Sequence, residues 1–324
     1  MIIVSTLLKV DNLQKYFPIK GGLLKRTVGQ VKAVDGVSFD LAVGETLGIV
    51  GESGCGKSTT GRMIAKIMDP TGGTIEFEGN DITKLRGKQL KKFRQEVQMV
   101  FQDPYASLNP RMAIQNIIAE PLEVNNIVRG KELIHRVEQL LVTVGLRPED
   151  RLRYPHEFSG GQRQRIGIAR ALALSPKMIV ADEVVSALDV SVQSQVLNLL
   201  VELKNKLDLA YIFISHDLSV IRHISDRVAV MYLGQIVEIA SKHEFYNNAL
   251  HPYAQALLSS APEPTRNSKR ERIVLEGEVP SPANPPQGCP FHTRCPHAMK
   301  ICSEVNPVMQ ERENEHFVAC HLYD

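Results

Sequence analysis

The chain has 324 residues and a mass of 36.1 kDa, which suits one large domain or two smaller ones. Hydrophobic residues make up 43% of it and charged residues 23%, a composition that excludes disordered, collagen-like and coiled-coil chains. The 38 lysines and arginines nearly balance the 36 acidic residues, so the net charge of +2 gives no reason to expect a nucleic acid as partner.

Neither a membrane span nor a disulfide framework is expected. No run approaches the roughly 18 consecutive apolar residues that a membrane-spanning helix needs. The first ten residues, MIIVSTLLKV, lack the basic segment and the small-residue cleavage site of a signal peptide, so we expect them to form an edge strand of a cytoplasmic protein. Five cysteines are an odd number for disulfide pairing, and they favour metal binding or redox chemistry instead.

Apolar runs and helix-like segments alternate along most of the chain, which is typical of an α/β fold. Residues 47–50, 178–182 and 211–215 are short and apolar, so we predict that they are central parallel strands. Residues 162–174 and 190–207 place apolar side chains at every third or fourth position. We predict that they are helices that cover the sheet.

Changes in composition predict the domain boundaries. Residues 1–258 form the main domain, in which residues 85–156 are predicted to be a mainly helical subdomain. A Gly-rich basic segment, residues 18–32, is interpreted as a solvated insertion. Residues 259–286 contain six prolines and predict an extended linker. Residues 287–324 hold four of the five cysteines and are predicted to form a small C-terminal extension.

A phosphate-binding loop is predicted at residues 51–59, GESGCGKST, which fill the pattern GxxxxGK[ST] between a predicted strand and a helical segment. Glycines in such a loop let successive backbone N–H groups point at phosphate oxygens, and the helix start adds positive potential. Lys57 would reach the β- and γ-phosphates, and the Ser58 hydroxyl would bind Mg²⁺. The alternative is a glycine-rich turn without a ligand. The residues expected to bind nucleotide are Gly51, Ser53, Gly54, Cys55, Gly56, Lys57, Ser58 and Thr59, with Cys55 at a variable position.

A second motif, MIVADE, ends a predicted central strand in the carboxylates Asp182 and Glu183. Ligands of open α/β sheets bind at the carboxyl ends of the strands. Asp182 fits the acid that holds Mg²⁺, and Glu183 fits a general base that orients the attacking water. A helix-capping turn is the alternative, and the phosphate loop favours the catalytic interpretation.

Residues 159–162, SGGQ, resemble the signature of ATP-binding cassette (ABC) ATPases, and the other family motifs occur in the family's order over about residues 7–240. The resemblance implies an α/β fold with an ABC-type P-loop core, a helical subdomain and an N-terminal antiparallel β portion. One departure is Val184, where relatives usually carry proline. The remaining matches are Gln102 in the Q-loop, Asp189 in the D-loop, His216 as the switch histidine and Tyr16 as the aromatic residue that stacks on adenine, with Phe17 as its alternative.

In this family two cassettes pair head to tail, and ATP lies between the phosphate loop of one and the signature of the other. The resemblance therefore implies that ATP binding closes the pair and that hydrolysis reopens it. It gives catalytic roles to Glu183, His216, Gln102 and Lys57. Mg²⁺ would be held by Ser58, Gln102 and Asp182, and further nucleotide contacts would come from Ser159, Gly160, Gly161, Gln162 and Asp189.

Residues 251–264, HPYAQALLSSAPEP, resemble a segment of the ATPases of dipeptide and oligopeptide importers, and residues 100–112 and 186–193 resemble the same group. This implies a peripheral subunit at the cytoplasmic face of the membrane. Its partners would be a homologous ATPase in a heterodimer, with a homodimer as the alternative for the isolated chain, two transmembrane permease subunits and an extracytoplasmic solute-binding protein. Nickel importers use near relatives, so the solute stays open. A soluble cassette ATPase acting on DNA or the ribosome would need a long coiled coil or tandem cassettes, which the sequence lacks.

The four C-terminal cysteines, Cys289, Cys295, Cys302 and Cys320, are separated by five, six and seventeen residues. Pro296 could start a helix that places Cys295 and Cys302 two turns apart on one face. The spacing resembles a C-terminal iron–sulfur motif of related importer ATPases, which implies a structural [4Fe–4S] cluster. Zinc is the alternative, with ligands that could include His292, His297, His316 and His321, and four unrelated buried thiols are a third interpretation.

Overall fold

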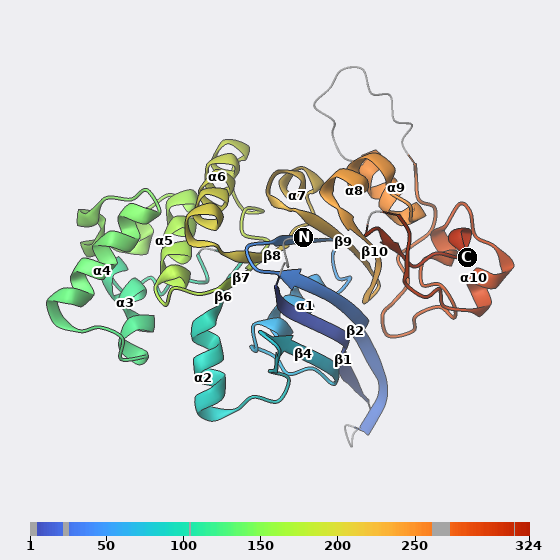
Figure 1. Cartoon of the computed structure of the whole chain (residues 1–324), viewed down its shortest axis with the longest axis horizontal. Coiled ribbons are helices and arrows are strands. Elements are labelled where there is room, and N and C mark those ends of the chain that lie inside the picture. The colour runs from blue at the N-terminus through green and yellow to red at the C-terminus, as the bar shows by residue number, and fades with distance from the viewer. Residues whose placement is uncertain (1–4, 22–25, 104, 261–272, 314) are drawn as a thin grey trace. The chain divides into compact units, whose positions relative to one another are not determined.

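The structure is a computed structural model that describes residues 5–21, 26–103, 105–260, 273–313 and 315–324 (Figure 1). These residues form two compact units. The first unit comprises residues up to 42, residues 46–84 and the chain from residue 214 onwards, and the second comprises residues 43–45 and 85–213.

The first unit contains an antiparallel sheet with the strand order β2-β1-β4-β5. Because β1 pairs with β2 on one side and with β4 on the other, the prediction of an N-terminal edge strand is wrong for the described residues, and residues 1–4 lie outside them. Within the segment interpreted as an insertion, the described residues 18–21 and 26–32 continue the β1–β2 hairpin, in which Pro18 pairs with Gln30, and residues 22–25 lie outside the described chain. The strands are β1 (Thr6–Gly21), β2 (Arg26–Ala42), β4 (Gly72–Phe77) and β5 (Asn80–Asp81).

A second sheet in this unit has the order β11-β12-β10-β9-β3. Strand β3 runs parallel to β9, while β10 is antiparallel to both β9 and β12. The cysteine-containing C-terminal region is therefore built onto this sheet through β12. The strands are β3 (Thr46–Val50), β9 (Arg227–Tyr232), β10 (Gln235–Ser241), β11 (Gln310–Glu311) and β12 (Phe317–Val318). The helices of this unit are α1 (Lys57–Ile64), α7 (Leu218–Ile224), α8 (Lys242–Asn248), α9 (Pro252–Ser260), η3 (His292–Arg294), α10 (Lys300–Glu304) and η4 (His321–Tyr323).

The second unit has strands in the order β8-β7-β6, with β6 parallel to β7. The strands are β6 (Val97–Val100), β7 (Met178–Asp182) and β8 (Ala210–Ile214), whose last residue belongs to the first unit. The helices are α2 (Gly87–Glu96), α3 (Ile114–Val124), α4 (Gly130–Thr143), η1 (Pro148–Leu152), η2 (Pro155–Glu157), α5 (Gly160–Leu172) and α6 (Val190–Leu207).

The predicted central strands are confirmed as β3, β7 and β8, and every residue of these strands is buried. The two predicted helices are confirmed as α5 and α6. Residues 85–156 are mainly helical, but the buried strand β6 interrupts them. A helix starting at Pro296 is wrong, because α10 begins only at Lys300. In the described part of the chain, we find no helix that has the length and apolar character to cross a membrane.

Candidate functional site

The loop between β3 and α1 has a backbone that only glycine fits at two positions. Gly51 has a φ of +152° and Gly56 a φ of +109°, both in the region that L-residues avoid. A Cβ atom at Gly51 would lie 2.1 Å from the carbonyl oxygen of Met231, and one at Gly56 would lie 2.2 Å from that of Ala33. The loop is therefore a tight turn of main chain that leads directly into a helix start, which is the arrangement that binds phosphate.

Lys57 folds back over this loop. Its side chain is buried, and Nζ donates hydrogen bonds to the carbonyl oxygens of Gly51 at 2.7 Å and Glu52 at 2.9 Å. This places one positive charge inside the turn. Burial raises the pKa of the neighbouring Cys55 thiol against the opposing effect of Lys57, so this thiol stays protonated and is not an activated nucleophile.

Two further predicted residues lie in the first unit. Tyr16, in β1, donates a hydrogen bond to the carboxylate of Asp35, and the pKa of its hydroxyl is raised to about 12 by burial and by that carboxylate. Lys32 Nζ lies 5.5 Å from the centre of the Tyr16 ring. His216 is exposed and lies between β8 and α7. Stacking of Tyr16 on adenine stays a prediction.

The second unit brings two of the predicted catalytic residues together. Asp182 is buried at the end of β7, and Glu183 follows it with a φ of +50°, in the left-handed region. Gln102 Nε2 donates to Glu183 Oε2 at 2.7 Å. Ser186 closes the turn, because its hydroxyl donates to the Glu183 carbonyl oxygen at 2.9 Å. Glu183 is thus held at both its side chain and its main chain.

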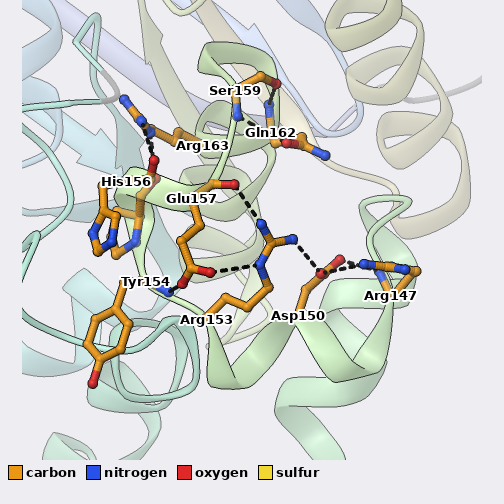
Figure 2. Close-up of polar contacts among 10 residues, drawn as sticks. Arg147, Asp150, Arg153, Tyr154, His156, Glu157, Ser159, Gln162 and Arg163 are labelled. Atoms are coloured by element: carbon orange, nitrogen blue, oxygen red, sulfur yellow. Dashed lines mark hydrogen bonds and ion pairs between the residues drawn. The ribbon is translucent and has the colours of Figure 1, made fainter.

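The segment SGGQ begins helix α5, and Figure 2 shows its two capping residues. Ser159 Oγ accepts from the Gln162 N–H at 3.4 Å, while the Ser159 N–H donates to Gln162 Oε1 at 3.0 Å. This reciprocal capping box fixes the start of the helix. Both side chains are exposed, so this helix start faces outward and is open to a ligand or partner.

Residues just before SGGQ form a charged network that the sequence analysis did not identify (Figure 2). Arg153 Nη1 donates to Asp150 Oδ1 at 3.2 Å, and its Nη2 donates to the Glu157 carbonyl oxygen at 2.7 Å. Burial alone would raise the pKa of Asp150, but hydrogen bonds from Arg147 and Arg153 outweigh it and lower the pKa. The network fixes the turn that leads to Ser159. Its only sequence signal is the density of charges in residues 147–157.

The D-loop lies beside the signature within the second unit. A Cβ atom at Gly160 would lie 3.2 Å from the Leu188 side chain, and one at Gly161 would lie 2.2 Å from that of Val192. Asp189 is exposed at the start of α6. Small residues at 160 and 161 therefore allow α5 to approach the D-loop closely. Val184 is buried, and the turn that contains it is closed by the hydrogen bond from the Ser186 hydroxyl to the Glu183 carbonyl oxygen.

The four C-terminal thiols lie within electrostatic range of one another. Burial, and then Cys302, Cys320 and Cys295, raise the pKa of Cys289 to about 11. Backbone N–H groups point at the sulfurs, as when Met299 N donates to Cys302 Sγ at 3.5 Å. Even so, no group of three or more His, Cys, Asp or Glu residues is arranged to hold a metal ion in the parts of the chain described above.

Comparisons with known proteins agree with the motifs. Residues 34–186 match the family model described as "ABC transporter", and residues 237–302 match "Oligopeptide/dipeptide transporter, C-terminal region". The chain is 61% identical to the "Oligopeptide transport ATP-binding protein AppF" of Bacillus subtilis over 322 residues, 98% of each protein. It is 49% identical to the "Dipeptide transport ATP-binding protein DppF" of Escherichia coli over 318 residues, covering 98% of this chain and 95% of that one.

A solved structure of similar fold comes from the ATP-binding cassette MJ0796, in a dimeric post-hydrolysis state bound to ADP and Pi. It has a TM-score of 0.65 and 27% sequence identity, and the match covers 73% of this chain and 99% of that one. The ABC cassette fold expected from the motifs is confirmed.

Proposed function

This chain is an ATPase of the ABC transporter family with the C-terminal region of the oligopeptide/dipeptide transporters, and we propose that it hydrolyses ATP to power peptide import. Two named relatives, one an oligopeptide and one a dipeptide transport ATP-binding protein, support peptides as the solute. The match of residues 237–302 to the transporter-specific C-terminal model carries the proposal most directly.

The phosphate loop is the proposed site of the ATP triphosphate. Its two glycine-only positions let the main chain turn tightly against the carbonyl oxygens of Met231 and Ala33. Lys57 would hold the β- and γ-phosphates, and the backbone N–H groups from Gly51 to Thr59 would surround them. Mg²⁺, held by Ser58, Gln102 and Asp182, would neutralise charge on the phosphates. Tyr16 is the proposed adenine contact and His216 the proposed γ-phosphate contact.

Glu183 is the proposed general base. Its carboxylate would take a proton from the attacking water, and the hydrogen bond from Gln102 would orient it. The positive φ of Glu183 supports this role, because strained backbone of this kind concentrates at functional sites. We place Ser159, Gly160, Gly161 and Gln162 against the nucleotide of a second cassette, with Asp189 acting across the same interface.

The proposed assembly contains a homologous ATPase, two transmembrane permease subunits and an extracytoplasmic solute-binding protein, and it has no nucleic acid. The chain would sit at the cytoplasmic face of the membrane. A heterodimer of ATPases is proposed, because the sequence resembles one of the two kinds of cassette subunit that such importers pair. Nickel is the second candidate for the transported solute.

We also propose that the four C-terminal thiols hold an iron–sulfur cluster. The Cys289 N–H donates to the Cys302 carbonyl oxygen at 2.8 Å and the Met299 N–H points at Cys302 Sγ, so two of the cysteine segments lie side by side, as a shared cluster would require. Two histidines that could join a zinc site are engaged elsewhere, since His316 Nε2 bonds to Glu238 at 2.7 Å and His321 Nε2 to the Val305 carbonyl oxygen at 2.9 Å. Iron and zinc analysis of the anaerobically purified chain tests this, and the absence of iron would contradict it.

Peptide import is tested with the chain assembled with its ATPase partner and permeases in vesicles that contain ATP, in the presence of the solute-binding protein. We expect uptake of di- to oligopeptides that requires internal ATP. Uptake of nickel ions in place of peptides would replace the proposed solute and leave the ATPase role intact.

A further inference from the structure

Glu52, the second residue of the phosphate loop, is held at each of its polar groups. Its carbonyl oxygen accepts from Lys57 Nζ at 2.9 Å. Its N–H donates to the hydroxyl of Tyr253 at 2.8 Å. Its carboxylate accepts two hydrogen bonds from Arg294, at 2.9 Å from Nη1 and 3.2 Å from Nη2. Both distant partners lie in the C-terminal part of the first unit.

The Arg294–Glu52 contact is a bidentate ion pair that is largely removed from water. The side chain of Arg294 is only 8% exposed, and that of Glu52 is 30% exposed. Fork-to-fork pairing of this kind fixes geometry as well as charge. The arginine side chain brings a positive charge to the Glu52 carboxylate through both of its terminal nitrogens.

Arg294 is itself fixed by its surroundings. It ends the short helix η3 and lies next to Cys295, between two of the clustered thiols. Phe291, at the start of this turn, is fully buried and packs against Tyr253 with 5.4 Å between the ring centres. Tyr253 is oriented in turn by His251, whose Nδ1 accepts the Tyr253 N–H at 3.0 Å. Residues 251–253 thus connect the C-terminal region to the phosphate loop.

We propose that Arg294, with Tyr253, is a positioning residue for nucleotide binding, so that the C-terminal cysteine-containing region is part of the phosphate site. The physical reason is that Glu52 carries a negative charge within the loop that is proposed to bind the negatively charged triphosphate. An unpaired Glu52 would repel the triphosphate, whereas paired with Arg294 it is neutral overall and anchors the loop. The inference rests on the proposed binding of ATP at this loop.

The test measures the Kd of MgATP for the full-length chain by calorimetry, together with KM and kcat for ATP hydrolysis. We expect Arg294→Ala to weaken binding about tenfold, equivalent to about 1.4 kcal/mol. KM should rise while kcat changes little, because Arg294 acts on the loop through Glu52 and is assigned no part in the chemical step. Arg294→Lys keeps the positive charge but cannot make two parallel hydrogen bonds to the Glu52 carboxylate. The MgATP affinity of this variant should therefore lie between that of wild type and that of Arg294→Ala.

A second substitution distinguishes this role from general support of the fold. In the double variant Arg294→Ala with Glu52→Gln, the unpaired carboxylate is gone, and MgATP affinity should recover to within about threefold of wild type. The matched control is Arg312→Ala. Arg312 donates to Gln310 Oε1 at 2.8 Å and to the Tyr323 carbonyl oxygen, so it supports the same C-terminal region without contact to Glu52.

Three outcomes would overturn the inference. They are wild-type affinity in Arg294→Ala, no recovery in the double variant, and an equal loss in Arg312→Ala. Lys57→Ala serves as the reference for the underlying site. If Lys57→Ala keeps normal affinity, the proposed nucleotide site itself is wrong; if Lys57→Ala loses affinity and Arg294→Ala does not, only the role of Arg294 fails.

Discussion

Gln102 donates a hydrogen bond from its side-chain amide to the carboxylate of Glu183, with 2.7 Å between nitrogen and oxygen. The two residues are 81 positions apart in the chain, and the contact joins the predicted Q-loop to the predicted base. The contact holds the carboxylate in one orientation.

We predict that Glu183→Gln lowers ATP turnover by about 100-fold or more while MgATP binding is retained, because the amide cannot accept the proton of the attacking water. Turnover is measured by phosphate release and binding by calorimetry. The closed, ATP-bound pair should accumulate on size-exclusion chromatography. Unchanged turnover would remove Glu183 from the role of base. Gln102→Ala should lower turnover less, since the carboxylate remains.

Lys57→Ala should weaken nucleotide affinity rather than destabilise the fold. The ammonium lies inside the phosphate loop on two carbonyl oxygens, where it would meet the β- and γ-phosphates. We expect a loss of MgATP affinity of at least about tenfold, equivalent to about 1.4 kcal/mol, with a melting temperature close to wild type in the absence of nucleotide. Normal affinity would place the triphosphate elsewhere.

Arg153→Ala should destabilise the turn before the signature. The substitution removes one of the two arginines on Asp150, whose side chain is 5% exposed, and leaves that carboxylate under-satisfied. The expected cost is about 1–3 kcal/mol of unfolding free energy. Chemical denaturation measures it, with Arg129→Ala as control, because the Arg129 side chain donates to the exposed side chain of Asn126, outside the Asp150 network. Equal stability of the two variants would contradict a structural role for the network.

Burial lowers the pKa of His251 to about 3, from its ordinary value of 6.5. Because the folded-state pKa is the lower one, the neutral imidazole contributes stability above pH 6.5, and this contribution is lost as the pH falls from 6.5 towards about 3. For this one group, the free energy of unfolding changes with pH by at most about 1.4 kcal/mol per pH unit. His251→Asn, which can still accept the Tyr253 N–H, should lose less stability than wild type between about pH 7 and pH 5. Parallel losses in the two proteins would show that His251 is not the group that titrates.

Buried segments with one clear pattern could be predicted from the sequence. Strands β3, β7 and β8 are buried at every position, so their apolar runs are unbroken, and the periodic pattern of residues 162–174 predicts helix α5. Long-range contacts could not be predicted. Arg294 and Glu52 are 242 positions apart, and nothing local in either segment indicates the other.

The wrong predictions have physical reasons as well. The N-terminal strand was expected at a sheet edge, but the later segment 72–77 pairs along its free side. Pro296 permits a helix start, but residues 296 and 297 instead form a turn that is closed by the Ala298 N–H on the Cys295 carbonyl oxygen, and α10 begins only at Lys300.

The central claim is that ATP hydrolysis by this chain drives peptide uptake, and vesicles containing the assembled transporter test it most directly. The measurement is uptake of labelled peptide with ATP inside the vesicles, comparing wild type with Glu183→Gln. We predict ATP-dependent uptake by wild type and uptake at the level of ATP-free vesicles for Glu183→Gln. Equal uptake by the two proteins would contradict the account.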